Sequence, residues 1–134
     1  REAYAKIRMV LQSVYTGSVY MEYFILKALC EMGFVADAYR RMCSRYYNLA
    51  VNENSTLWED FMILGSRNHA WSGAPLNIAF QYFAGIKTTD GFKTYTVNPA
   101  VGLFDSMDVS FTARGRRVKV TVRDESVHIE ETPI

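Results

Sequence analysis

The first part of the chain places apolar residues three and four positions apart, which is the spacing of one helical face. This pattern predicts a first helix over residues 2–14. Residues 16–18 (Thr-Gly-Ser) interrupt the pattern, and Ser18 is expected to cap a second helix from Val19 to Met32. Apolar residues occupy almost the whole circumference of this second helix, so we expect neighbours on several of its sides. Gly33 is expected to end it.

Two further helices are predicted, from about Ala36 to Val51 and from Pro75 to Ile86, with a polar loop over residues 52–55 between them. The positions of the third helix that we expect to be buried are Val35, Tyr39, Met42, Cys43, Tyr46 and Leu49 or Ala50, and its solvated side carries Arg40, Arg41 and Arg45. In the fourth helix, the side chains expected to face neighbours are Leu76, Ile78, Ala79, Phe80, Tyr82 and Phe83.

From Asp90-Gly91 onward the apolar period changes to two, which is typical of strands with one buried and one wet face. Four strands are expected, containing Phe92, Tyr95 and Val97; Met107, Val109 and Phe111; Val118, Val120 and Val122; and residues 127–132. Arg114-Gly115 and Asp124-Glu125 are predicted turns between them. Helices followed by strands predict an α+β fold with segregated parts and a junction near residues 87–90.

Composition narrows the class of protein. The chain has 134 residues, 49% hydrophobic and 22% charged, as in an ordinary globular domain. A formal net charge of +1 provides no basic excess for tracking phosphates, so we expect no nucleic-acid partner. No apolar run reaches the roughly 20 residues of a membrane span. No signal peptide is recognisable, and because the first residue is Arg1 rather than Met, the compartment is left open.

The two cysteines, Cys30 and Cys43, have neither the spacing of metal ligands nor the density of a disulfide scaffold, and we expect buried free thiols. The sequence contains no nucleophile elbow, no metal-ligand cluster and no phosphate-binding glycine loop, so no cofactor is expected. His128 alternates with strand residues and is expected to be exposed.

Residues 56–71 concentrate aromatic and titratable side chains, because they hold both tryptophans, Trp58 and Trp71, together with Glu59 and His69. Beside an indole, Glu59 is either an acid–base group with a raised pKa or a solvated carboxylate in the first turn of a short helix. His69 is a donor to ligand hydroxyls, a base, or a structural histidine. The two tryptophans either stack on a sugar face or fill a core.

Three blocks resemble the end of the catalytic domain of bacterial α-L-rhamnosidases, glycoside hydrolase family 78. They are Thr56-Leu57-Trp58-Glu59-Asp60-Phe61, Ser66-Arg67-Asn68-His69-Ala70-Trp71-Ser72-Gly73-Ala74-Pro75 and Phe83-Ala84-Gly85-Ile86. The resemblance extends to Ala28-Leu29-Cys30-Glu31-Met32-Gly33 and to the pairs Gly91-Phe92 and Asn98-Pro99. It therefore covers nearly the whole chain. In this chain Glu59 and His69 are ten positions apart, closer than in many members.

The resemblance implies that residues 1–88 are the last helices of an (α/α)6 barrel and that residues 89–134 are part of an antiparallel β-sandwich. It implies an inverting hydrolase that removes terminal α-L-rhamnose, with two carboxylates roughly 6.5–9.5 Å apart. Glu59 would be the general base, His69 would hydrogen-bond the sugar, and Trp58 and Trp71 would line the pocket.

No block that resembles the family's general acid precedes Glu59, so we expect the isolated chain to be an inactive fragment. The expected partners are a rhamnose-containing saccharide or glycoside and the remainder of the parent barrel, with a homo-oligomer as a further option. Two alternatives stay open. One is a non-catalytic carbohydrate-binding or interaction module; the other is an unrelated stand-alone helical domain with a β-hairpin tail, whose apolar faces would be covered.

Overall fold

The computed structural model of the chain describes residues 2–51, 56–62 and 64–134, so the predicted polar loop at 52–55 lies outside the described residues. Contacts divide the chain into two compact units, which we call the helical unit (Arg1–Ile78) and the sheet unit (Ala79–Ile134). The predicted α+β class is confirmed, since helices precede two antiparallel sheets. In the described part of the chain, none of the helices has the length and apolar character that crossing a membrane requires.

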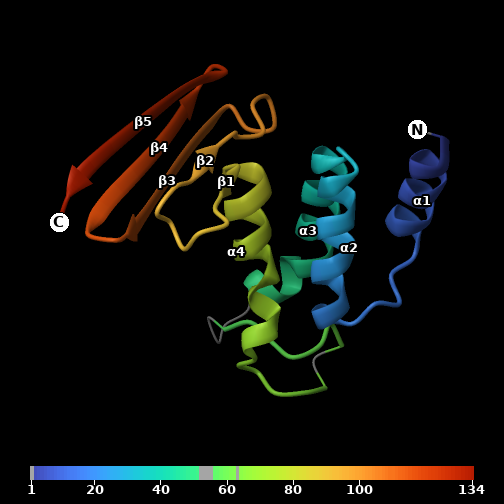
Figure 1. The fold of residues 1–134 in the computed structure, drawn as a ribbon. Helices are drawn as coiled ribbons and strands as arrows, with labels where there is room; N and C mark the ends of the chain where they lie inside the picture. The colour runs from blue at the N-terminus through green and yellow to red at the C-terminus, as the bar shows by residue number, and fades with distance from the viewer. Residues whose placement is uncertain (1, 52–55, 63) are drawn as a thin grey trace. The chain divides into compact units, whose positions relative to one another are not determined.

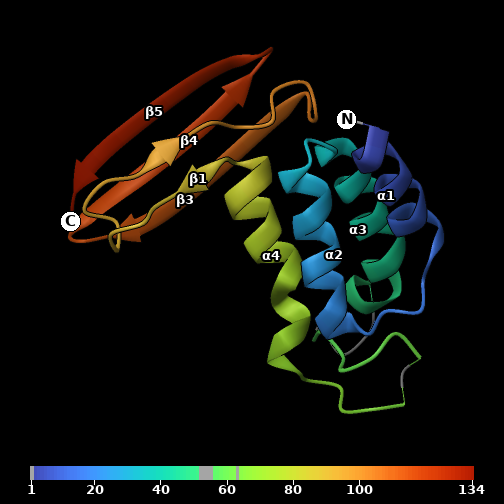
Figure 2. The ribbon, with the colours of Figure 1, turned by 45° about the vertical axis from the view of Figure 1, so that its right-hand side comes forward.

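The second helix is the centre of the helical unit. This unit comprises α1 (Glu2–Ser13), α2 (Val19–Glu31), α3 (Val35–Ala50), the 3-10 turn η1 (Ala70–Gly73) and α4 (Ala74–Ile78). Helix α2 packs against all four of the others, as predicted from its apolar circumference (Figures 1 and 2). Both predicted ends are confirmed, because the Ser18 hydroxyl accepts from the Met21 amide at 3.3 Å and Gly33 adopts a φ of 87°.

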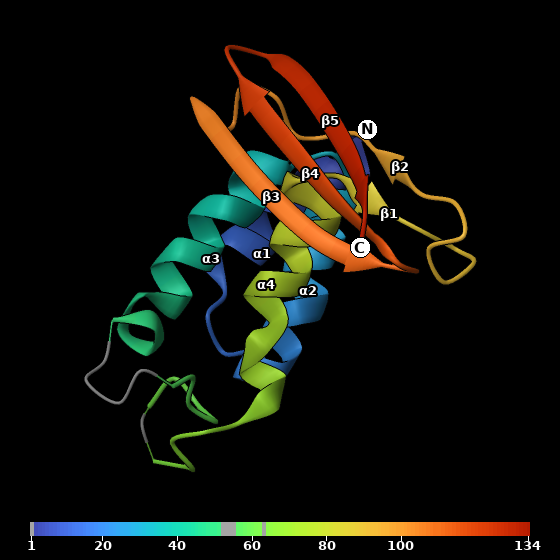
Figure 3. The ribbon, with the colours of Figure 1, turned by 90° about the vertical axis from the view of Figure 1, so that its left-hand side faces the viewer.

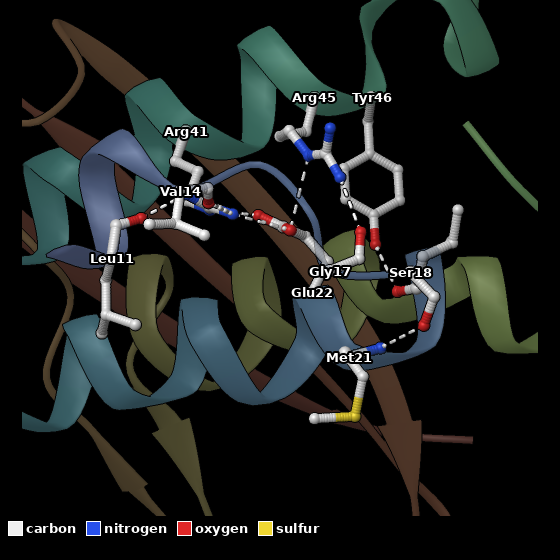
Figure 4. A network of polar contacts seen from close by, with 10 residues as sticks. Leu11, Val14, Gly17, Ser18, Met21, Glu22, Arg41, Arg45 and Tyr46 are labelled. Carbon is white, nitrogen blue, oxygen red and sulfur yellow. Dashed lines mark hydrogen bonds and ion pairs between the residues drawn. The ribbon is translucent and has the colours of Figure 1, made fainter. Parts of the chain in front are cut away.

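The buried face of α3 differs from the predicted one. Arg41, expected to be solvated, is only 3% exposed, because its guanidinium is paired with the fully buried carboxylate of Glu22 on α2 (Figure 4). Cys43, expected to be buried, is exposed, whereas Cys30 is buried. Charged side chains are almost never buried unless they are paired, and apolar periodicity cannot indicate a partner on another helix.

The predicted fourth helix is not one regular element. Ala74–Ile78 is α-helical, η2 (Ala79–Phe83) is π-helical, and Ile86 belongs to a strand. The Ala84 amide donates to the Ala79 carbonyl at 2.8 Å, which is the wider turn of a π-helix. Leu76, predicted to face a neighbour, lies in the α-helical part and is 78% exposed, so that prediction is wrong.

The sheet unit contains a short and a long antiparallel sheet. Strand β1 (Ile86–Lys87) pairs with β2 (Thr96–Val97), and β3 (Ser106–Ala113), β4 (Arg116–Arg123) and β5 (Ser126–Pro133) lie in the order β3-β4-β5 (Figure 3). Both predicted hairpin turns are confirmed. Arg114 and Gly115 have φ of 52° and 72°, and Asp124 and Glu125 have 46° and 67°, the left-handed pairs that close two-residue hairpins.

The core of the sheet unit is built on β4, on β1 and on the residues just before β1. Ala84 and Ile86 form one buried cluster with Val118 and Val120, and Phe80 packs against it. The structural division therefore falls before residues 87–90, where the sequence pattern changes. The predicted strand over residues 92–97 is reduced to Thr96–Val97, because Phe92 has a φ of 63° and the Asp90 carboxylate accepts from the Thr94 amide at 3.0 Å to form a local turn.

Candidate functional site

The segment that carries Glu59 and His69 doubles back on itself. The Glu59 amide donates to the Ser66 carbonyl at 2.9 Å, and the His69 amide donates to the Leu57 carbonyl at 3.0 Å. These two bonds bring together side chains that are ten positions apart. The short helix considered for Glu59 is absent from this described segment, because these backbone groups bond across a loop rather than along a helix.

The tip of this loop is closed by the carboxylate of Asp60. It accepts hydrogen bonds from the amides of Met62 at 2.7 Å, Leu64 at 3.1 Å and Gly65 at 2.6 Å. A Cβ atom on Gly65 would lie 2.7 Å from Glu59 Oε2 and 2.8 Å from Asp60 Oδ2. A larger residue at position 65 would therefore require both carboxylates to shift. Sequence reasoning assigned Asp60 and Gly65 no role; an Asp five residues before a Gly was the only signal.

Glu59 presents a half-exposed carboxylate. Its Oε2 accepts from the Ser66 amide at 2.9 Å, and its side chain is 36% exposed. The Ser66 backbone hydrogen bond is the main cause that holds the pKa of Glu59 below its usual value, and the Ser66 side chain and His69 act in the same direction. The hypothesis of a pKa raised by a neighbouring indole is therefore wrong, because hydrogen bonds outweigh desolvation here.

His69 lies between this carboxylate and an aromatic surface. Its Nδ1 is 3.0 Å from the Ser66 hydroxyl and 3.7 Å from Glu59 Oε2, so Ser66 is its hydrogen-bond neighbour. The imidazole lies against the Trp71 ring, with centroids 4.0 Å apart and planes inclined by 32°. Trp71 in turn donates from Nε1 to the Glu59 carbonyl at 3.1 Å. These contacts place a carboxylate, an imidazole and an indole side by side.

The two tryptophans differ in their surroundings. Trp71 is 43% exposed, whereas Trp58 is 8% exposed. The Ser72 hydroxyl donates to the Trp58 carbonyl, and the Arg67 guanidinium lies 5.5 Å from the centre of the Trp58 ring. Of the two alternatives considered for the tryptophans, Trp58 therefore fits a core role and Trp71 fits a surface that a ligand can reach.

An aromatic hollow adjoins Trp71. It has a volume of ≈ 230 Å³ and is lined by Tyr20, Tyr23, Trp71, Gly73, Ala74 and Asn77. The Tyr20 and Trp71 rings are 5.7 Å apart and inclined by 52°. The tyrosines come from α2, where the sequence pattern assigned them to helix packing, and no sequence signal separates them from packing residues.

A second hollow in the helical unit is almost wholly apolar. It measures ≈ 310 Å³ and is lined by Met42, Cys43, Tyr46, Tyr47, Ala50, Leu57 and Pro75.

Within residues 2–51, 56–62 and 64–134, no group of three or more His, Cys, Asp or Glu side chains is arranged to bind a metal ion. The exposed position predicted for His128, on β5, is confirmed. The polar residues around Glu59 therefore form the candidate functional site.

Comparison of the chain with protein-family models, with curated proteins and with solved structures found no significant match.

Proposed function

We propose that this chain is the general-base side of an inverting glycosidase of the α-L-rhamnosidase type, and that Glu59 is the base. The observation that supports this best is the setting of the Glu59 carboxylate. It is half-exposed, it is fixed by the Ser66 amide, and its pKa lies below the usual value. Such a carboxylate is ionised at neutral pH, as a group that accepts a proton from water has to be.

In the proposed reaction, Glu59 removes a proton from water while the water oxygen attacks the anomeric carbon. A second carboxyl group protonates the departing oxygen from the opposite face, and we assign that acid to the remainder of the parent barrel. The Ser66 hydroxyl fixes the His69 ring through Nδ1, and we assign a sugar hydroxyl to Nε2, on the other side of the ring.

The aromatic hollow supports a sugar as the ligand. Trp71 and Tyr20 offer flat ring faces on which the C–H groups of a pyranose can pack, and Asn77 supplies an amide at the rim. The C6 methyl group of rhamnose adds to the apolar face of that sugar. The proposed pocket is therefore lined by Trp71 together with Tyr20 and Tyr23, and Trp58 is not part of it.

The uncovered apolar surface of the helical unit supports a larger parent. Helix α1 is amphipathic but contributes no buried residue, and its Tyr4, Met9 and Val10 are 52%, 65% and 56% exposed. Side chains of this kind pack on further helices in a barrel. The alternative of a stand-alone helical domain predicts covered apolar faces, and this exposure counts against it.

The proposed function is tested by replacing Glu59 with Gln in the complete enzyme and following hydrolysis of an aryl α-L-rhamnoside. We expect kcat to fall by about 10²–10⁴-fold. Glu2→Gln is the control, because Glu2 lies on α1 with a side chain 84% exposed, and we expect it to leave kcat unchanged. Near-normal turnover by Glu59→Gln would remove Glu59 from the mechanism.

A non-catalytic carbohydrate-binding module is the second candidate, because the aromatic hollow lies wholly on this chain. The Trp58→Phe variant leaves Trp71 as the single tryptophan, so its fluorescence reports on the hollow. Saturable quenching by L-rhamnose with the 134-residue chain alone would favour the binding module. No response would favour a pocket that the rest of a barrel completes.

A further inference from the structure

Strand β5 forms an edge of the long sheet, and its outer side has no strand partner among the described residues. All eight of its residues are exposed, including Val127 and Ile129, at 42% and 44%. On the other edge strand, β3, the apolar side chains pack against the core cluster instead. An exposed edge that carries apolar side chains is a template for pairing with another strand.

The register of the hairpin shows which backbone groups point outward. Arg123 and Ser126 flank the two-residue turn and are directly opposite each other, and such a flanking pair exchanges both of its hydrogen bonds. Bonded and non-bonded pairs alternate from there. The amides and carbonyls of Val127, Ile129 and Glu131 therefore point away from β4, toward the open edge.

Pro133 has the same outward position as these three residues, opposite Arg116 in the register. Because proline has no amide hydrogen, its position costs no bond to β4 and it ends the run of outward donors. The open edge thus has a defined length, which begins after the turn at Asp124-Glu125 and stops before Pro133.

We propose that β5 is a dimerisation edge, which pairs antiparallel with β5 of a second copy of this chain so that Ile129 lies opposite the partner's Ile129. In this register, Val127 lies opposite the partner's Glu131, and the outward groups of Val127, Ile129 and Glu131 form three bonded pairs with two hydrogen bonds each.

Charge selects this register over its neighbours. His128 faces the partner's Glu130, and by symmetry this donor–acceptor pair forms twice, at the closely spaced positions where side chains interact most. A shift of two residues in one direction would place His128 opposite the partner's His128. The same shift in the other direction would place Glu130 opposite the partner's Glu130, where like charges repel.

The opposite face of the paired strands is compatible with the same register. Ile129 meets the partner's Ile129 there, beside Val120 of its own β4. Glu131 lies opposite the partner's Val127, and its carboxylate is already bound by Arg116 at 3.1 Å and by the Tyr95 hydroxyl. The dimer would be one continuous antiparallel sheet in which neither β5 is an edge.

The test is the mass of the 134-residue chain in solution, measured by sedimentation velocity with a reductant to keep the exposed Cys43 as a thiol. We expect a dimer. Ile129→Pro removes one outward amide and no bond to β4, and we expect a monomer. The matched control is Ser110→Pro on β3, whose amide points outward by the same alternation from the Ala113–Arg116 pair, and we expect it to remain a dimer.

A charge exchange tests the register and does not depend on a proline variant that folds. His128→Glu places carboxylates opposite each other and should raise the dimer dissociation constant by about tenfold. His128→Glu combined with Glu130→His restores the pairing only if residue 128 faces residue 130 of the other copy, so the double variant should dimerise like the original chain. A monomeric original chain, a dimeric Ile129→Pro variant or a double variant that stays weakened would each overturn the proposal.

Discussion

Glu22 on α2 and Arg41 on α3 form an ion pair from which water is excluded, with side chains 0% and 2% exposed. Arg41 Nη2 lies 3.0 Å from both Glu22 Oε2 and the Val14 carbonyl, and Nη1 donates to the Leu11 carbonyl (Figure 4). Arg45 donates to the Gly17 carbonyl at 2.7 Å. The buried pair therefore joins α2 to α3. The hydrogen bonds of Arg41 and Arg45 also hold the end of α1 and the segment that leads to α2 against α3.

Removing one member of this pair leaves an uncompensated charge in the core. We predict that Glu22→Gln lowers the free energy of unfolding by about 3–5 kcal/mol, measured by urea denaturation. The control is Glu2→Gln, which breaks the exposed Glu2–Lys6 pair and should change stability by less than about 0.5 kcal/mol. Equal effects of the two variants would contradict the structural role of Glu22.

Asp37 provides a pH-dependent contribution to stability. Its side chain is 4% exposed and is bound by Arg8 and Arg40, and the Arg8 hydrogen bond is the main cause that lowers its pKa. A carboxyl with a lower pKa in the folded state stabilises fully above its unfolded pKa of about 3.9. That stability is lost as the pH falls through the folded pKa.

We therefore predict that Asp37→Asn destabilises the chain at pH 7 and that the difference from the original chain shrinks as the pH is lowered below about 4. Thermal unfolding at a series of pH values measures it. A difference that is constant from pH 7 to below the carboxyl range would show that the charge of Asp37 does not contribute.

The features that the sequence predicted well are those with local causes. The Ser18 cap, the Gly33 helix end and the two hairpin turns each depend on residues within a few positions. Apolar periodicity misplaced Arg41 and Cys43, because the buried face of α3 is decided by a carboxylate on another helix. Local rules have no access to such tertiary partners.

The same distinction applies to the candidate site. Residue types singled out Glu59, His69 and Trp71, and the structure brings these three together. The hydrogen bonds that set the pKa of Glu59 come from Ser66, seven positions later, across a loop whose geometry no periodic pattern describes. Tyr20 joins the site from α2, which is a long-range contact that the sequence does not signal.

Gly65 is predicted to control the acidity of Glu59. A methyl group at this position would lie 2.7 Å from Glu59 Oε2, the atom that accepts from the Ser66 amide, so this carboxylate would have to shift. We expect Gly65→Ala to raise the pKa of Glu59 toward its usual value, measured by NMR titration of the carboxyl carbon. Gly73→Ala is the control, because nothing lies within 4 Å of an added Cβ there, and it should leave this pKa unchanged.

Gly85 is predicted to be irreplaceable in the sheet unit. A Cβ atom there would overlap the Asn98 carbonyl, whereas the same atom at Gly91 meets nothing within 4 Å. The two glycines have nearly the same φ, 67° and 68°, so the cost of the backbone conformation is matched. Gly85→Ala should therefore cost more than about 1 kcal/mol beyond Gly91→Ala in denaturant unfolding. Equal costs for the two variants would show that the backbone conformation alone, and not the contact with the Asn98 carbonyl, makes glycine necessary at position 85.

The role of Glu59 as general base is tested most directly by chemical rescue of a Glu59→Ala variant of the complete enzyme. The substrate is an aryl α-L-rhamnoside with a leaving group that needs little acid assistance. We predict that hydrolysis falls by about 10²–10⁴-fold. Azide, entering the space of the missing carboxylate and its water, should restore turnover and yield a rhamnosyl azide of inverted configuration. Near-normal hydrolysis without azide, or an azide product of retained configuration, would contradict the assignment of Glu59.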